Sequence, residues 1–186
     1  MIWKRIFGRT DRDEGPYAIY NALVAQARQP WFYLDGGVPD TLEGRFEMVM
    51  LHAFLVLRRM KALGDPAREV GQRVFDIMFD DMDQTLREIG VGDLSVGKKI
   101  KGMAAAFYGR IAAYDEGLDA EKPGVLDAAL KRNLFAMAEP SATQVSAVAN
   151  YLRLADGALA TQEADTILAG AIRFPVVPVE ENRSVS

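Results

Sequence analysis

The stretch "DTLEGRFEMVMLHAFLVLRRMKAL", residues 40–63, decides the fold class. Apolar side chains recur along it at the spacing of one helical face, namely Leu42, Phe46, Val49, Met50, Ala53, Leu57 and Met60. Other apolar side chains extend this surface to the far side, and a helix that is apolar on most sides is central to a fold. Asp40 and Glu43 have the spacing of a capping box. We therefore expect a helix from Asp40 to about Leu63 at the centre of the core, with Phe46 on its apolar face.

Helical patterns also run through the rest of the chain. Residues 17–29 follow Pro16, which suits a first helical position, and they stop before Pro30. Residues 31–40, "WFYLDGGVPD", predict a loop. Further helices are predicted from Pro66 to Ile89, from about Val96 to Gly117, over residues 123–138, over residues 144–160 behind a capping box of Ser141 and Gln144, and over residues 163–174.

No convincing alternation of period two occurs, so the sequence predicts an all-α fold, a single compact domain of six or seven helices. We expect this helical domain to span residues 16–174. We expect residues 1–15, which precede this domain, to form a basic amphipathic N-terminal segment. Residues 175–186 contain two prolines and no helical pattern, which predicts an extended or disordered tail.

Composition narrows the classes of function. The net charge of −4 offers no basic field for phosphate contacts, so direct nucleic-acid binding is not expected. The chain has no cysteine, which excludes disulfides, thiolate metal sites and cysteine nucleophiles. The longest apolar stretch, residues 46–57, is shorter than the roughly 20 residues that span a bilayer. The start "MIWKRIFGRTDRDEG" turns polar before any apolar signal region develops. A soluble or peripheral protein is expected.

A second stretch, "FDDMDQTLREIGVGDLSVGKKIK", residues 79–101, gathers charge around a glycine-rich turn. On the helix before the turn, Asp76, Asp80, Asp83 and Arg87 lie beside an apolar stripe formed by Phe75, Phe79, Met82, Leu86 and Ile89. On the helix after it, Lys99 and Arg110 edge the apolar stripe, whereas Lys98 and Lys101 face away. The two helices therefore bring an acidic and a basic border to one corner.

Three chemical interpretations of this corner are open. Asp80, Asp81 and Asp83 resemble the aspartate-rich magnesium motif of isoprenyl synthases, but Gln84 stands where that motif has a carboxylate, and no second such helix occurs. Gly92, Gly97 and Lys98 match a phosphate-loop pattern, but Lys99 replaces its Ser or Thr and a helix replaces its strand. The third interpretation is a tight turn with solvated charges, capped by Asp93 or Ser95. The aspartates are also candidates for internal pairing with Lys99 and Arg110.

Residues elsewhere offer no better candidate for a catalytic centre. His52, the only histidine, lies on the strongly apolar helix with no nearby serine or cysteine for it to activate, so we expect a hydrogen-bonded core or near-surface histidine. Arg58 and Arg59 end the same helix, where cations suit the helix dipole. We expect no catalysis, no metal and no cofactor.

Both stretches closely resemble the ubiquinol-cytochrome c chaperone family. The resemblance covers about residues 38–118. It rests on Asp40, Thr41, Gly44, Arg45 and Phe46, on Asp81, Met82, Asp83, Leu86, Arg87, Glu88, Gly90, Val91, Gly92 and Asp93, and on Val96, Gly97, Lys98, Phe107, Tyr108, Gly109 and Arg110. It implies a non-enzymatic assembly chaperone that receives newly made cytochrome b, acting in mitochondria with a small partner protein.

The resemblance and the charge pattern together give a candidate protein-binding surface of Asp76, Asp80, Asp83, Arg87, Glu88, Lys98, Lys99, Lys101 and Arg110. The N-terminal residues Ile2, Trp3, Lys4, Arg5, Ile6 and Phe7 have the composition of a short helix that lies weakly on an anionic membrane surface. We therefore expect a cytoplasmic protein, peripheral on the inner face of the cytoplasmic membrane. The alternatives are a magnesium-dependent isoprenoid-diphosphate enzyme and a helical scaffold without a client.

Overall fold

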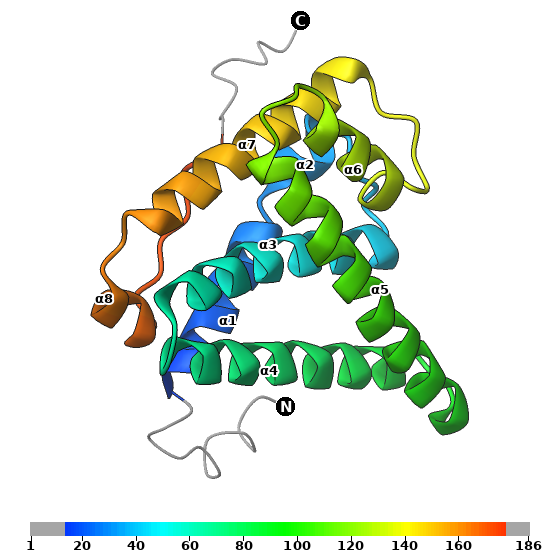
Figure 1. Ribbon diagram of the computed structural model, residues 1–186. Helices are drawn as coiled ribbons and strands as arrows, with labels where there is room; N and C mark the ends of the chain where they lie inside the picture. The colour runs from blue at the N-terminus through cyan, green and yellow to red at the C-terminus, as the bar shows by residue number, and fades with distance from the viewer. Residues whose placement is uncertain (1–13, 178–186) are drawn as a thin grey trace, which may run out of the picture.

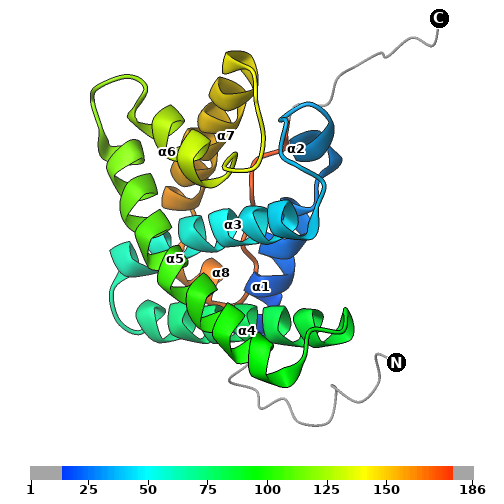
Figure 2. The same ribbon diagram turned by 90° about the vertical axis from the view of Figure 1, so that its right-hand side faces the viewer.

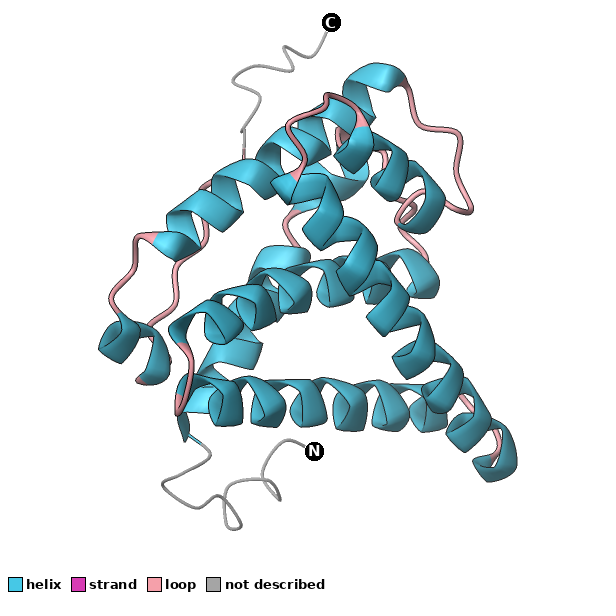
Figure 3. Cartoon of the chain, in the orientation of Figure 1, coloured by secondary structure: helices cyan, strands magenta, loops and turns pink. Residues whose placement is uncertain are grey.

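The computed structural model describes residues 14–177, and this part of the chain forms α-helices and no strand (Figures 1 and 3). Six helices are long: α1 (Glu14–Ala27), α3 (Leu42–Leu63), α4 (Ala67–Glu88), α5 (Asp93–Asp119), α6 (Val125–Asn133) and α7 (Ala142–Ala160). Two have five residues each, α2 (Pro30–Leu34) and α8 (Ala164–Leu168). The prediction of a compact all-α fold is confirmed.

Helix α3 is the centre of the core, as its sequence predicts. Every residue from Met48 to Val56 is buried, and α1, α4 and α7 pack around the helix (Figure 2). Its first turn differs from the expectation by one residue. The N-cap is Thr41, whose hydroxyl accepts a hydrogen bond from the backbone N–H of Gly44, and the carboxylate of Asp40 pairs with Arg45 instead.

Phe46 lies on the predicted apolar stripe of α3, but the structure does not bury it fully. Phe46 is half-buried, because it lies in the first turns of α3, where the helix leaves the core and forms part of a surface groove. Phe54, two turns further along, is 1% exposed and packs on Tyr114 with a ring separation of 5.5 Å. The helical spacing placed Phe46 on the main apolar stripe and Phe54 on the far side of the helix, but spacing does not show where along a helix the neighbouring helices end.

The segment predicted as a loop contains a short helix, α2. Pro30 occupies its first turn, and Phe32 is fully buried. The remainder of the segment is irregular, with Gly37 at a φ of 73°. Two later helices are shorter than their patterns suggest. Residues 134–138 leave the helical path in turns that still bury Leu134 and Phe135, and α8 ends before Gly170, whose φ is 88°.

A buried polar chain crosses the core at His52. The Nδ1–H of His52 donates to the carbonyl of Met48 at 2.8 Å, which leaves Nε2 to accept from the hydroxyl of Tyr151, also at 2.8 Å. Tyr151 in turn accepts from the amide of Gln26 at 3.1 Å. Burial lowers the pKa of His52 to about 4, so the ring is neutral at pH 7. The expectation of a hydrogen-bonded core histidine is confirmed.

The corner between α4 and α5 closes with glycines. Gly90 has a φ of 90°, and the N–H groups of Gly90 and Val91 donate to the carbonyls of Arg87 and Leu86. Gly92 is the N-cap of α5 and Asp93 is already helical, so neither Asp93 nor Ser95 caps the helix. Gly97 and Lys98 lie within α5, which removes the phosphate-loop interpretation. From this corner α5 passes beside α3 and reaches α6 (Figure 1).

Candidate functional site

A surface groove of about 410 Å³ lies where α3, α4 and α5 approach one another. Its apolar lining comes from the first turns of α3, from the end of α4 and the turn after it, and from the middle of α5: Leu42, Phe46, Met50, Leu86, Ile89, Val91, Met103 and Ala106. Gly102 and four charged residues complete the lining, and the charged residues are Glu43, Glu47, Lys99 and Arg110. Such a lining suits an apolar ligand whose orientation is fixed by a few polar contacts.

The wall of the groove between α3 and α5 is an ion pair. The Nε of Arg110 donates to the carboxylate of Glu47 at 2.7 Å, and a second guanidinium nitrogen donates to its other oxygen. Both side chains are less than a fifth exposed. Burial raises the pKa of Glu47, and the facing guanidinium of Arg110 opposes that rise. The pair therefore fixes α5 against α3 at the point where the groove opens.

Internal pairing of the acidic stripe with Lys99 or Arg110 does not occur, because Arg110 faces Glu47. Asp83 instead accepts from Arg87 at 2.5 Å, and Arg87 also pairs with Asp93 across the corner. Asp76 accepts from Gln72 on its own helix at 2.8 Å. Asp76 and Asp83 are thus bound by neighbours on α4, and Asp93 at the start of α5 shares Arg87 with Asp83.

The structure does not support the magnesium interpretation, because the aspartates are engaged by other side chains. Asp81 accepts a hydrogen bond from the hydroxyl of Tyr20 at 2.8 Å, and Asp83 is held by Arg87, so these two carboxylates are engaged by different partners. Within residues 14–177 the structure brings together no group of three or more carboxylate or histidine side chains that could hold a metal ion.

The structure divides the protein-binding candidates. Lys99 and Arg110 line the groove, whereas the other candidates lie outside it, along α4 and in the first part of α5: Asp76, Asp80, Asp83, Arg87, Glu88, Lys98 and Lys101. The candidates Ile2 to Phe7 lie outside the described residues, as does most of the predicted tail. Sequence reasoning missed Glu43, Glu47 and the apolar floor as parts of one site. One available signal was Glu47 itself, a carboxylate inside the longest apolar run.

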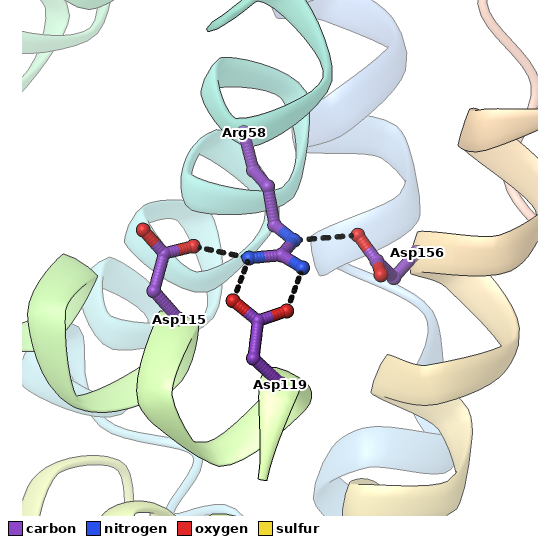
Figure 4. A network of polar contacts seen from close by, with 4 residues as sticks. All are labelled: Arg58, Asp115, Asp119 and Asp156. Atoms are coloured by element: carbon purple, nitrogen blue, oxygen red, sulfur yellow. Dashed lines mark hydrogen bonds and ion pairs between the residues drawn. The ribbon is translucent and has the colours of Figure 1, made fainter. Parts of the chain in front are cut away.

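A second ionic cluster positions the far end of α5 (Figure 4). Arg58, near the end of α3, pairs with Asp115 at 2.6 Å and Asp119 at 2.5 Å on α5, and with Asp156 on α7 at 3.0 Å. Hydrogen bonding to Asp119 is the main cause that raises the pKa of Arg58, and it lowers the pKa of Asp119. Arg58 therefore acts as a three-helix clamp beyond the helix-dipole role that the sequence suggests, and it fixes the direction of α5 along the groove.

These features define an all-α protein with an open apolar groove bordered by charge, which is the architecture of a binding protein. The chain belongs to the ubiquinol-cytochrome C chaperone family, whose model matches residues 34–174. The resemblance stated from the sequence is therefore confirmed, and the matched residues contain the whole groove.

Individual relatives agree with this assignment. The chain is 29% identical over 165 residues to ubiquinol-cytochrome c reductase complex assembly factor 1 of Mus musculus, covering 88% of this chain and 55% of the mouse protein. It is 26% identical to the factor of that name from Xenopus laevis, covering 90% and 84% of the two chains. The crystal structure of the Cbp3 homolog from Brucella abortus superposes with a TM-score of 0.80 at 37% identity, covering 89% of this chain and 91% of that chain.

The chain thus spans little more than half the length of the mouse relative. Among residues 14–177, no helix combines the length and the apolarity that crossing a bilayer requires.

Proposed function

We propose that this protein is an assembly chaperone of the ubiquinol-cytochrome c reductase complex, and that it holds the cytochrome b subunit in the groove between α3, α4 and α5 without catalysis. The groove is the observation that carries the proposal. It is built from residues 42–50, 86–91 and 99–110, which lie within the stretches that carry the family resemblance. The names of the mouse and frog relatives, both assembly factors of this complex, support the same role.

The lining of the groove suits an apolar client segment. A subunit destined for a membrane exposes apolar helix surface that water would drive to aggregate, and burial of that surface in a groove lowers its free energy. Met103 lines the groove and is half-buried, and methionine adapts its shape to different apolar partners. The groove is open and its volume is about 410 Å³, so it accommodates the side chains on one face of a client helix rather than the whole helix.

The charges at the groove favour one orientation of the client. Glu43 at the start of α3 and Lys99 on α5 are both exposed, whereas Glu47 and Arg110 neutralise each other in the wall. Exposed charges at the rim of an interface contribute more to orientation and association rate than to affinity. The client is therefore bound through its apolar face and oriented by these two rim charges, at the inner face of the cytoplasmic membrane where such a client inserts.

The proposal is tested by filling the groove. Ala106 lines the groove and is itself exposed, so Ala106→Arg adds volume and charge there without disturbing the core. Ala112→Arg, on an exposed position of the same helix outside the groove, is the matched control. Both variants should melt within a few degrees of the parent protein. Ala106→Arg should lower the yield of cytochrome b that co-purifies from solubilised membranes by about tenfold, a loss of about 1.4 kcal/mol of binding free energy, while Ala112→Arg should not.

Equal yields of cytochrome b with all three proteins would contradict a client site in this groove. If the parent protein itself captures no cytochrome b, the helical scaffold without a client becomes the better description.

A further inference from the structure

The apex of the α4–α5 corner exposes large apolar side chains to solvent. Leu94, in the first turn of α5, is 97% exposed, and Ile89, just after the end of α4, is 57% exposed. Gly90 and Gly92 lie between them, and no side chain comes within 4 Å of the position that a Cβ would occupy at either of these glycines. The corner stands away from α2, α6 and α7 (Figures 1 and 2). It is a convex apolar tip, unlike the groove beside it.

Lysines follow this tip along α5. Leu94, Lys98 and Lys101 have the i, i+4, i+7 spacing of one helical face, and Tyr108, 63% exposed, continues the same face two turns further on. All three lysines in this part of the helix, including Lys99 at the groove edge, are exposed. Between Asp93 and Asp115, α5 carries no acidic residue. The tip is thus followed by a basic, weakly apolar face.

The acidic residues nearest the tip are neutralised only in part, and their remaining charge is smaller than that of the three lysines. Arg87 pairs with both Asp83 and Asp93. Glu88 is exposed and accepts a hydrogen bond from the neutral side chain of Gln84, so its negative charge adds to the one that Arg87 leaves uncompensated on the two aspartates. Within the described residues no carboxylate forms an ion pair with Lys98, Lys99 or Lys101. The positive charge of the three lysines is therefore available to an external partner.

We propose that the α4–α5 corner docks on an anionic lipid surface, with Leu94 and Ile89 inserted among the headgroups and Lys98 and Lys101 contacting negatively charged lipids. Apolar side chains beside lysines are the pattern of interfacial membrane contacts. Leucine and isoleucine at the apex favour lipid over nucleic acid, because nucleic acid offers phosphates and base edges instead of an apolar layer. A convex tip also needs no shape-complementary partner. Since Ile89 and Val91 also line the groove, such docking places the groove opening next to the bilayer.

The residues of this surface are other than those of the predicted basic N-terminal segment, residues 1–15, and the proposal does not depend on the identity of the client. The experiment uses the full chain, so that the predicted N-terminal contact is tested under the same conditions.

The absence of native cysteine allows a site-specific probe. Leu94→Cys is labelled with an environment-sensitive fluorophore and mixed with vesicles of phosphatidylcholine alone or with added phosphatidylglycerol. Leu154→Cys, on α7 and 66% exposed, is the matched control. The label at position 94 should shift to the blue with the anionic vesicles and far less with the neutral ones, and the label at position 154 should not respond.

A second arm uses sedimentation of unlabelled protein with the same anionic vesicles. The variant Lys98→Gln/Lys101→Gln should bind at least tenfold more weakly, since each lysine near an anionic surface contributes about a fivefold change in partitioning. The control Lys122→Gln/Lys131→Gln removes the same charge from exposed positions elsewhere and should bind like the parent protein. Because all four lysines are exposed, the melting temperatures should be unchanged.

The proposal is overturned if the label at position 94 does not respond to anionic vesicles, or if the two lysine variants sediment equally with them. Equal sedimentation would assign the membrane contact to another part of the chain, such as residues 1–15. A response of the label to added RNA in the absence of lipid, without a response to vesicles, would also overturn it.

Discussion

Arg110 on α5 and Glu47 on α3, which are 63 positions apart in the sequence, form a two-point ion pair in the wall of the apolar groove. Both side chains are more than four-fifths buried, so each carboxylate and guanidinium depends on the other for compensation of its charge. The pair holds the two walls of the groove at a fixed separation.

Loss of Arg110 should therefore destabilise the protein. Arg110→Leu leaves the Glu47 carboxylate buried without a cation, and we expect the free energy of unfolding at pH 7 to fall by about 2 to 4 kcal/mol. Without Arg110 to oppose burial, the pKa of Glu47 rises further. The deficit should shrink as the pH falls toward 4.5, because protonation of Glu47 removes the uncompensated charge. Urea unfolding at both pH values measures this, and the double variant Glu47→Gln/Arg110→Leu should recover most of the loss at pH 7.

His52 should make the free energy of unfolding of the parent protein decrease as the pH falls. Its pKa is lowered from 6.5 to about 4 in the folded state, so the neutral ring contributes stability that is fully present above pH 6.5 and is lost as the pH falls toward 4. The loss attributable to His52 should approach about 3 kcal/mol at the acid end. His52→Leu should flatten the curve of unfolding free energy between pH 6.5 and 5. An unchanged slope in that variant would mean that another group causes the dependence.

Phe46 and Phe54 should respond differently to truncation. Phe54→Ala empties a fully packed site and should cost about 3 to 5 kcal/mol. Phe46→Ala opens onto the groove, where water can enter, and should cost roughly half as much. Denaturant unfolding of the two variants side by side makes the comparison. Equal losses of unfolding free energy would mean that Phe46 is packed in the core and does not form part of the groove lining.

The acidic stripe can be neutralised without disturbing the core. Asp76→Asn/Asp80→Asn/Asp83→Asn removes exposed ion pairs, which are worth about 0 to 1 kcal/mol each, so the melting temperature should change by only a few degrees. Participation of these aspartates in client binding stays a prediction, in which the yield of captured cytochrome b falls. None of the three aspartates lines the groove. If the variant captures a normal yield of cytochrome b, the client surface does not extend beyond the groove to these aspartates.

Much of the fold could be predicted because it follows local patterns. The apolar run of α3, the capping box at Ser141 and the glycine at position 90 act over a few residues, and the structure shows all three as expected. The helix α2 was missed because Pro30, Gly36 and Gly37 are turn signals, whereas burial of Phe32 against Tyr151 stabilises one short helix between them. Packing between distant residues overrides local propensity there.

The groove could be predicted only in part. The stripe pattern placed Lys99 and Arg110 at the edge of an apolar seam, and both line the groove. The pattern could not show that Arg110 faces Glu47, because the partner of a charge is set by how α5 crosses α3. The same limit applies to Arg58, whose three aspartates come from two other helices. Spacing within one helix defines a face, and tertiary packing decides what that face meets.

The most direct test of the central claim is site-specific photo-crosslinking in living cells. A photoreactive amino acid replaces Glu43 or Ala106, which line the groove, or Glu116 or Ala112, which are exposed on α5 away from it. The account predicts that cytochrome b is captured from the first two positions and not from the other two, with all four proteins folded and equally abundant. Capture of cytochrome b from Glu116 and Ala112 but not from Glu43 and Ala106 would contradict the account.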